Sequence, residues 1–392
     1  MNGGLSLGVI DRKPKAIRIT HLVILATLLG FWLFAIATRS PTKVVFVNKD
    51  GKRVLTLDYE ATSAFAEGLA PVKRGGKWGY VDKRGVVIVP PTFAEAGSFH
   101  DGLSLVVHHG KAGFIDHKGE FGISPQFERG SDFSDELAAV SQAGKFGYVD
   151  VSGKFVIRPQ FESADPFHEG LAAVAVGEAG AARWGYVDRT GRFAIPARFE
   201  LAGSFSDGLA AVKVREPDGD KWGYIDRSGI FVIQPRFEDA VMFADGLAAV
   251  QIIATSPGPT SNGQAVSGSD AVSGWGFIDR KGFLAIDPRF QQSRRFSQGL
   301  AAVRSGAKWG YIDKSGEWAI APKFDEARDF SEGLALVGAR DAAGRMGYGY
   351  IDSGGRYVFN SQTGIADASY FSEGLASLTV SRTWYERLSP LN

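Results

Sequence analysis

An internal repeat, most often spaced by 34 residues, constrains this chain more than any other feature. The hexapeptide KWGYVD that ends at Asp82 returns as KWGYID at Asp226 and at Asp313, and related versions end at positions 116, 150, 188, 279 and 352. With a divergent first copy, KVVFVN, nine units fill residues 44–380. A unit this short cannot bury its own apolar face, so each unit is expected to pack against the next.

Each unit reads as short strands joined by turns. Trp309 and Tyr311 alternate with smaller residues, which is the two-residue period of a β-strand. Asp313 to Gly316 predicts a tight hairpin turn, with the aspartate bonding backbone N–H groups and the glycine taking a positive φ. The return strand ends at Pro322, which cannot donate to a ladder, and a three-residue apolar period then indicates a compact corner. Each unit is therefore predicted to hold about three strands and an aromatic corner.

Two sets of repeated residues are predicted to build the array. The packing wedge between units is assigned to the tryptophans, because large rings bury the most surface: Trp78, Trp184, Trp222, Trp275 and Trp309. The alternative is that exposed aromatic rings stack on sugars. The hairpin turns are assigned to Asp82 and Gly85, Asp116 and Gly119, Asp150 and Gly153, Asp188 and Gly191, Asp226 and Gly229, Asp279 and Gly282, and Asp313 and Gly316. The acid of the Phe-Ser-Glu-Gly corner (Glu169, Asp207, Asp245 and Glu332) is expected to tighten a turn or to stay solvated.

The shared pattern K-W-G-Y-I-D-x-x-G-x-[WF]-x-I-x-P-x-F-x-x-A-x-x-F-S-E-G-L-A-x-V resembles the WG-repeat family, a group found mainly in bacteria. The resemblance covers nearly everything after residue 43. Ala112, Phe146 and Tyr348 depart from it by standing where tryptophan is expected. The resemblance implies a β-rich repeat body and supplies no catalytic residue.

Glycine (50 residues) and aromatic residues (12%) are frequent enough to favour many short strands. We predict an all-β fold in which the repeats form an open, solenoid-like array of hairpin units. A closed β-propeller is the alternative. Units of 34 residues are short for the four strands of an ordinary propeller blade, which favours the open array. A feature that favours closure is that the repeats start with a strand matching WGY and end with a strand matching LAAV, which could complete one unit together. A contact between the first and last units would decide for the propeller.

The N-terminal region carries a separate signal. Residues 22–38 (LVILATLLGFWLFAIAT) hold no charge and follow four basic residues, which predicts a transmembrane signal anchor or, alternatively, a cleaved signal peptide. The predicted organisation is a cytoplasmic basic segment (1–21), this helix (22–38), a linker (39–43), the repeat domain (44–381) and a tail (382–392). The repeat domain is therefore expected outside the cytoplasm, tethered to the membrane or, after cleavage, periplasmic or secreted.

The sequence predicts binding rather than catalysis. Outside residues 1–43 the chain holds 38 basic and 42 acidic residues, which gives no footprint for nucleic acid. No cysteine is present, and no nucleotide or hydrolase motif occurs. The clustered His100, His108, His109 and His117 are expected to be polar residues on the surface rather than a metal site. We therefore expect no enzyme activity, cofactor or metal, and a protein or glycan partner outside the cytoplasm. Insertions at 177–182, 215–220, 254–274 and 338–344 fall at one joint of the repeat, where they are either tolerated surface length or a binding edge.

Overall fold

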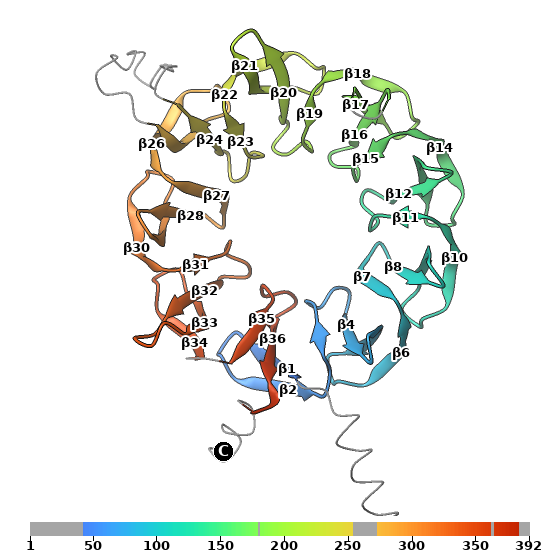
Figure 1. The fold of residues 1–392 in the computed structure, drawn as a ribbon, viewed down its shortest axis with the longest axis vertical. Helices are drawn as coiled ribbons and strands as arrows, with labels where there is room; N and C mark the ends of the chain where they lie inside the picture. Colours follow the sequence, from blue (N-terminus) through green and yellow to red (C-terminus); the bar gives the residue numbers. More distant parts are fainter. Residues whose placement is uncertain (1–41, 179–180, 254–272, 362–363, 384–392) are drawn as a thin grey trace, which may run out of the picture. The chain divides into compact units, whose positions relative to one another are not determined.

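The computed structural model describes residues 42–178, 181–253, 273–361 and 364–383. Its 36 named elements are all β-strands, and they form nine sheets of four strands each. The sheets follow one another around a ring as the blades of a β-propeller (Figure 1). The all-β prediction is therefore confirmed for the repeat domain. The helix predicted at residues 22–38 lies outside the described residues.

The strands of a blade follow one another from the centre of the ring outwards (Figure 1). Blades 1 to 9 begin with the innermost strands β3 (Ala61–Thr62), β7 (Glu95–His100), β11 (Arg129–Gly130), β15 (Ser163–Ala164), β19 (Leu201–Ala202), β23 (Asp239–Ala240), β27 (Gln292–Ser297), β31 (Glu326–Ala327) and β35 (Ile365–Ala368). The second strands carry the LAAV motif and are β4 (Leu69–Arg74), β8 (Leu103–His108), β12 (Leu137–Gln142), β16 (Leu171–Val176), β20 (Ala210–Glu216), β24 (Ala248–Ile252), β28 (Leu300–Ser305), β32 (Ala335–Arg340) and β36 (Leu375–Ser381).

The WGY motif forms the third strands and the return segment forms the fourth. The third strands of blades 1 to 9 are β5 (Lys77–Asp82), β9 (Lys111–Ile115), β13 (Lys145–Asp150), β17 (Arg183–Asp188), β21 (Gly219–Ile225), β25 (Gly274–Ile278), β29 (Lys308–Ile312), β33 (Met346–Ile351) and β1 (Thr42–Asn48). The outermost strands are β6 (Val87–Phe93), β10 (Phe121–Phe127), β14 (Phe155–Phe161), β18 (Phe193–Phe199), β22 (Phe231–Phe237), β26 (Leu284–Phe290), β30 (Trp318–Phe324), β34 (Tyr357–Ser361) and β2 (Arg53–Leu57).

The two ends of the repeat domain close the ring by sharing blade 9. Strand β1 pairs antiparallel with β36 over its whole length, from Thr42 opposite Ser381 to Asn48 opposite Leu375. The open array is therefore wrong, and the alternative, a closed propeller, is the observed fold. This is the contact between first and last units that distinguishes the two.

The estimate of three strands per unit is also corrected. The aromatic corner contains a fourth strand that is only two residues long in six of the blades, for example Glu326–Ala327 in β31. A strand this short leaves no alternating pattern to detect in the sequence. The sequence unit is also offset from the blade, because the WGY and return strands end one blade and the corner and LAAV strands start the next.

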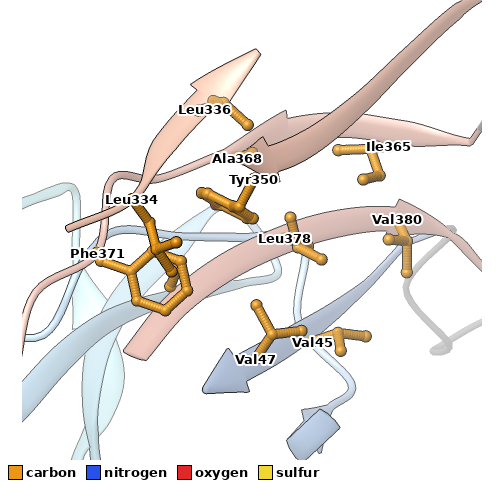
Figure 2. Close-up of a cluster of buried hydrophobic side chains, with 11 residues drawn as sticks. Val45, Val47, Leu334, Leu336, Tyr350, Ile365, Ala368, Phe371, Leu378 and Val380 are labelled. Carbon is orange, nitrogen blue, oxygen red and sulfur yellow. The ribbon is translucent and has the colours of Figure 1, made fainter. Parts of the chain in front are cut away.

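The hydrophobic core lies between neighbouring blades rather than inside each one. At the closure, Val45, Val47 and Leu378 of blade 9 form one buried cluster with Leu334 and Leu336 of blade 8 (Figure 2). Similar clusters join the other blades. A blade separated from its neighbours would expose these side chains, so the ring is stabilised by stacking as the repeat predicts.

Candidate functional site

The second aromatic residue of the WGY motif lies deeper than the tryptophan. Tyr80, Tyr148, Tyr186, Tyr224 and Tyr311 are fully buried, with relative exposures of 0%. The hydroxyl of Tyr148 donates to the Asp165 carbonyl of the following blade at 2.7 Å, and Tyr224 makes the equivalent bond to Val241 at 2.8 Å. Burial raises the pKa of these tyrosines well above the ordinary value. Each tyrosine therefore stays neutral and bridges two blades.

The tryptophans assigned as wedges are half-buried and contact the edge of the same clusters. This holds for Trp78, Trp184, Trp222, Trp275 and Trp309. Cations lie over three of these rings, with Lys73 Nζ 5.7 Å from the Trp78 centroid, Lys213 Nζ 6.0 Å from that of Trp222 and Arg294 Cζ 5.9 Å from that of Trp309. The glycine after each tryptophan lies against a bulge in the return strand, where a Cβ at Gly79 would stand 2.3 Å from the Val89 carbonyl oxygen.

The aspartates assigned to the hairpin turns each accept backbone N–H groups from their own turn. In blade 3, Asp150 Oδ1 accepts the N–H groups of Ser152 at 2.9 Å and Lys154 at 3.1 Å. The Ser152 hydroxyl and these N–H groups lower the pKa of the Asp150 carboxyl. The same pattern of bonds occurs at Asp82, Asp116, Asp188, Asp226, Asp279 and Asp313.

The turn glycines combine a positive φ with a contact to the preceding blade. Gly153 has a φ of 82°, and a Cβ there would lie 3.0 Å from Ile123 of blade 2. The other assigned glycines also have φ near 80° and approach the matching Val, Ile or Leu: Gly85, Gly119, Gly191, Gly229, Gly282 and Gly316. The turn is therefore part of the blade interface as well as a chain reversal.

A ring of hydrogen bonds joins the corner turns of neighbouring blades, and the sequence analysis missed it. In each corner the residue before the glycine, or before Glu136 in blade 3, has a positive φ, for example 52° at Glu169, and its side chain reaches the next turn. Glu169 accepts the Gly208 N–H at 3.2 Å and Glu332 accepts the Gly374 N–H at 2.9 Å. The same bond runs from Gly68 to Glu373, Gly102 to Glu67, Glu136 to Asp101, Gly170 to Asp135, Gly246 to Asp207, Gly299 to Asp245 and Gly333 to Gln298, so the nine bonds close on themselves.

Basic side chains reinforce part of this ring. Lys49 Nζ lies 3.0 Å from Glu332 and His117 Nε2 lies 3.0 Å from Glu67, each base coming from the hairpin turn of the following blade. Partial burial opposes ionisation of Glu332, but its bonds to Lys49 and the Gly374 N–H lower its pKa overall. The signal that could have found the ring was an acid before glycine in nearly every unit. Its partner was unpredictable because it lies at least one whole repeat away.

The four clustered histidines make three separate sets of contacts. His117 stacks on Phe99, with ring centroids 4.5 Å apart, and His108 and His109 contact edge-on at 4.0 Å. His100 lies 4.0 Å from Asp132. Among the residues that the structure describes, no group of three or more metal-ligating side chains is placed to hold an ion.

The inner wall, meaning the innermost strands and the corner segments after them, varies in charge from one blade to the next. We define the corner pair as the two residues just before the buried corner phenylalanine. These pairs are Ser63 and Ala64, Gly97 and Ser98, Ser131 and Asp132, Asp165 and Pro166, Gly203 and Ser204, Val241 and Met242, Arg294 and Arg295, Arg328 and Asp329, and Ser369 and Tyr370. Basic residues occupy these positions only in blades 7 and 8, while carboxylates without a basic neighbour in the pair occupy blades 3 and 4.

A cavity of about 460 Å³ lies at the basic sector, which we define as the corner pairs of blades 7 to 9. Its walls include Arg294, Arg295, Arg328, Asp329 and Tyr370. A smaller cavity of about 180 Å³ adjoins it and shares Arg328 and Tyr370. This sector is the candidate functional site, and the sequence analysis missed it because no single unit contains it.

The family comparison agrees with the repeat geometry. The WG containing repeat matches eight times, at residues 46–78, 78–111, 113–146, 146–178, 184–216, 222–252, 275–309 and 309–338. The chain belongs to the WG containing repeat family. The resemblance drawn from the WGY units is thereby confirmed.

Comparisons of this WG-repeat chain with known proteins address only the fold. No curated protein matches its sequence. A eukaryotic initiation factor is similar in structure, with a TM-score of 0.57, 10% sequence identity, and coverage of 82% of this chain and 96% of the other. Hsv2 of Kluyveromyces lactis has a TM-score of 0.36 at 10% identity, covering 74% of this chain and 98% of that one. Such low identities say nothing of function.

The membrane prediction falls outside the described part of this WG-repeat protein. Between residues 42 and 383, leaving aside the gaps given above, no helix has the length and apolar character needed to cross a bilayer. The span predicted at 22–38 is not among the described residues.

Proposed function

We propose that this protein is a non-catalytic binding scaffold whose propeller lies outside the cytoplasm, held by the N-terminal apolar segment. The observation that carries the proposal is the use of the repeated polar groups. The turn aspartates bond their own turns, the corner acids bond the next blade, and the WGY tyrosines bond the next corner. A catalytic site needs unlike groups that converge on one substrate, whereas these groups serve the same structural purpose in each blade.

Two surfaces remain available for a partner. The inner wall carries the basic sector described above. The second surface is formed by the insertions, which lie between the second and third strands of a blade, for example between β20 and β21 and between β32 and β33. Because strands alternate in direction, all turns between second and third strands emerge on one face of the ring. Insertions gathered on one face of a repeat protein commonly build its binding surface.

Protease accessibility tests the location. The full chain, tagged at its C-terminus, is expected to be protected from added protease in intact cells. It should be digested in spheroplasts whose inner membrane is still intact. A propeller that resists digestion until the inner membrane is lysed would place it in the cytoplasm and overturn this part of the proposal.

Binding is tested by presenting the purified full chain to envelope proteins and to a glycan array. Retention on one of the two is expected, and flat responses on both would reject the scaffold function. A variant with residues 254–272 replaced by a two-glycine turn, as at Gly75 and Gly76, separates the insertion face from the inner wall.

Glycan binding is the second candidate function. It is favoured by Tyr370, which at 57% exposure is the most exposed aromatic side chain among the described residues. Exposed tyrosine rings beside polar groups are suited to the apolar faces of sugars.

A further inference from the structure

The basic sector of the inner wall has the chemistry of a ligand site. Arg294, Arg295 and Arg328 are exposed around the cavity of about 460 Å³, a volume in the range of small-molecule sites. Two arginines on one blade and a third on the next are a local concentration of charge on an inner wall that is otherwise neutral or acidic at these positions. Guanidinium groups match the geometry of carboxylate and other oxyanions.

The arginines are only partly committed to partners within the protein. Arg295 Nε lies 3.3 Å from Asp329 Oδ2, and Arg294 lies over the Trp309 ring. In the described part of the chain, the Arg328 guanidinium makes neither a hydrogen bond nor an ion pair, and Arg328 borders both cavities. In the larger cavity three guanidinium groups face one paired carboxylate. Asp367 adds a second carboxylate in the smaller cavity, so the two cavities together still carry a net positive charge for a ligand.

Two further groups restrict what the ligand can be. Tyr370 presents an exposed ring in the same cavity, which offers an apolar platform beside the charges. Asp329 also lines the cavity and its side chain is 26% exposed; its Oδ1 is buried without a hydrogen-bond partner among the described residues, and its Oδ2 pairs with Arg295. Each carboxylate oxygen has about two lone pairs, so Oδ2 can accept a hydrogen bond from a ligand hydroxyl in addition to its pairing with Arg295.

We infer that the basic sector binds a sugar acid, meaning a saccharide that carries a carboxylate. Arg328 and Arg294 hold the carboxylate, Tyr370 stacks on the sugar ring, and Asp329 accepts a hydrogen bond from a hydroxyl of that ring. An acidic peptide would satisfy the arginines but would supply neither a hydroxylated ring for Tyr370 nor a set of hydroxyl donors for Asp329. The inference rests on the proposed binding function and names its ligand.

Titration calorimetry of the purified full chain with glucuronate, glucose, inorganic phosphate and a tetraglutamate peptide tests the assignment. Glucuronate is expected to bind more tightly than the other three, and its affinity is expected to fall as salt rises, because the contact is between charges. Arg328→Gln should weaken glucuronate binding about ten-fold, since it removes a charged hydrogen bond. Arg192→Gln, at an exposed arginine outside the cavity, is the matched control and should bind as the unaltered chain does.

The sugar ring is tested separately from the charge. Tyr370→Ser should weaken glucuronate several-fold and leave phosphate unchanged. Equal binding of glucose and glucuronate, no effect of Arg328→Gln, or tighter binding of tetraglutamate would each overturn the assignment. The salt dependence of the unaltered chain decides the charge contact even if a variant fails to fold. If glucuronate fails while the chain still retains a glycan or an envelope protein, the ligand assignment falls and the scaffold function stands.

Discussion

The corner pairs of blades 3 and 4 and those of blades 7 and 8 occupy the same place in the repeat but carry opposite charge. Asp132 and Asp165 form the acidic sector, and burial raises the pKa of both carboxyls above the ordinary value, with His100 and His168 acting in the opposite direction. The basic sector carries Arg294, Arg295 and Arg328 instead.

The framework around the two sectors is the same. Tyr148 beside the acidic sector and Tyr311 beside the basic sector are equally buried and bond the next corner at 2.7 and 2.8 Å. The repeat therefore fixes the blade interfaces and leaves the corner pair free to vary. The residues that join the blades and the residues that vary in charge are thus different positions of one unit.

The largest expected effect comes from the shared framework. Tyr148→Ala and Tyr311→Ala should each reduce the free energy of unfolding by about 3–5 kcal/mol, because each leaves a cavity between two blades. Denaturant unfolding of the full chain measures both. Tyr148→Phe, which keeps the ring, should cost only about 1 kcal/mol. The losses of unfolding free energy in Tyr148→Ala and Tyr311→Ala should be similar. If they differ by more than the loss in Tyr148→Phe, the two sectors do not share one framework.

The turn glycines should give the next largest effect. Gly153→Ala and Gly316→Ala force a side chain to adopt a φ of 82° or 86° and place its Cβ 3.0 Å from an isoleucine of the preceding blade. We expect each to cost about 1–3 kcal/mol. Gly144→Ala has a similar φ, 75°, in open space, so a smaller loss there isolates the blade contact. An equal loss in all three variants would leave backbone strain as the whole effect.

The ring of corner bonds distinguishes the sectors by charge. Asp135→Ala leaves the Gly170 N–H without its charged acceptor, and Gln298→Ala removes the neutral acceptor of Gly333. We expect a loss of about 1 kcal/mol for each in thermal unfolding, with the larger loss at Asp135 because bonds to charged groups are stronger. A larger loss at Gln298 would contradict this account.

The smallest expected effect is a pH dependence confined to the acidic sector. A raised pKa means that the folded chain holds the Asp165 proton more tightly than the unfolded chain, so stability falls as pH rises from the ordinary aspartate pKa through the raised one. Asp165→Asn removes this loss. It should therefore be more stable than the unaltered chain at pH 7 by less than about 1 kcal/mol, and the two should converge near pH 3.

The turn aspartates provide the opposite control. Their pKa values are lowered, so the stability that they supply is present above the ordinary aspartate pKa and is lost as pH falls through the lowered value. Asp150→Asn should therefore matter most at neutral pH, with the sign reversed from Asp165→Asn. The same sign at both positions would show that net charge, not local environment, controls the effect.

Much of the local structure could be predicted because its causes lie within one unit. The alternation at Trp309 and Tyr311, the turn from Asp313 to Gly316 and the end of pairing at Pro322 are all short-range effects. The corner could not be predicted in full, since a two-residue strand such as Glu326–Ala327 has no periodicity to read. The relative burial of Trp222 and Tyr224 was equally hidden, because both point to one face and only the neighbouring blade decides which ring it covers.

The amino-acid sequence alone reveals the repeat, its family and the need for each unit to pack on the next. The first two rest on residues that recur along the chain, and the third rests on the small size of one unit. Two features emerge only in three dimensions: the array closes through β1 lying against β36, and Arg294, Arg328 and Tyr370 meet at one cavity. Both depend on how one blade stacks on the next. A small rotation between blades, summed around the ring, brings β1 against β36, and the stacking of blades 7 to 9 brings the three side chains to one cavity.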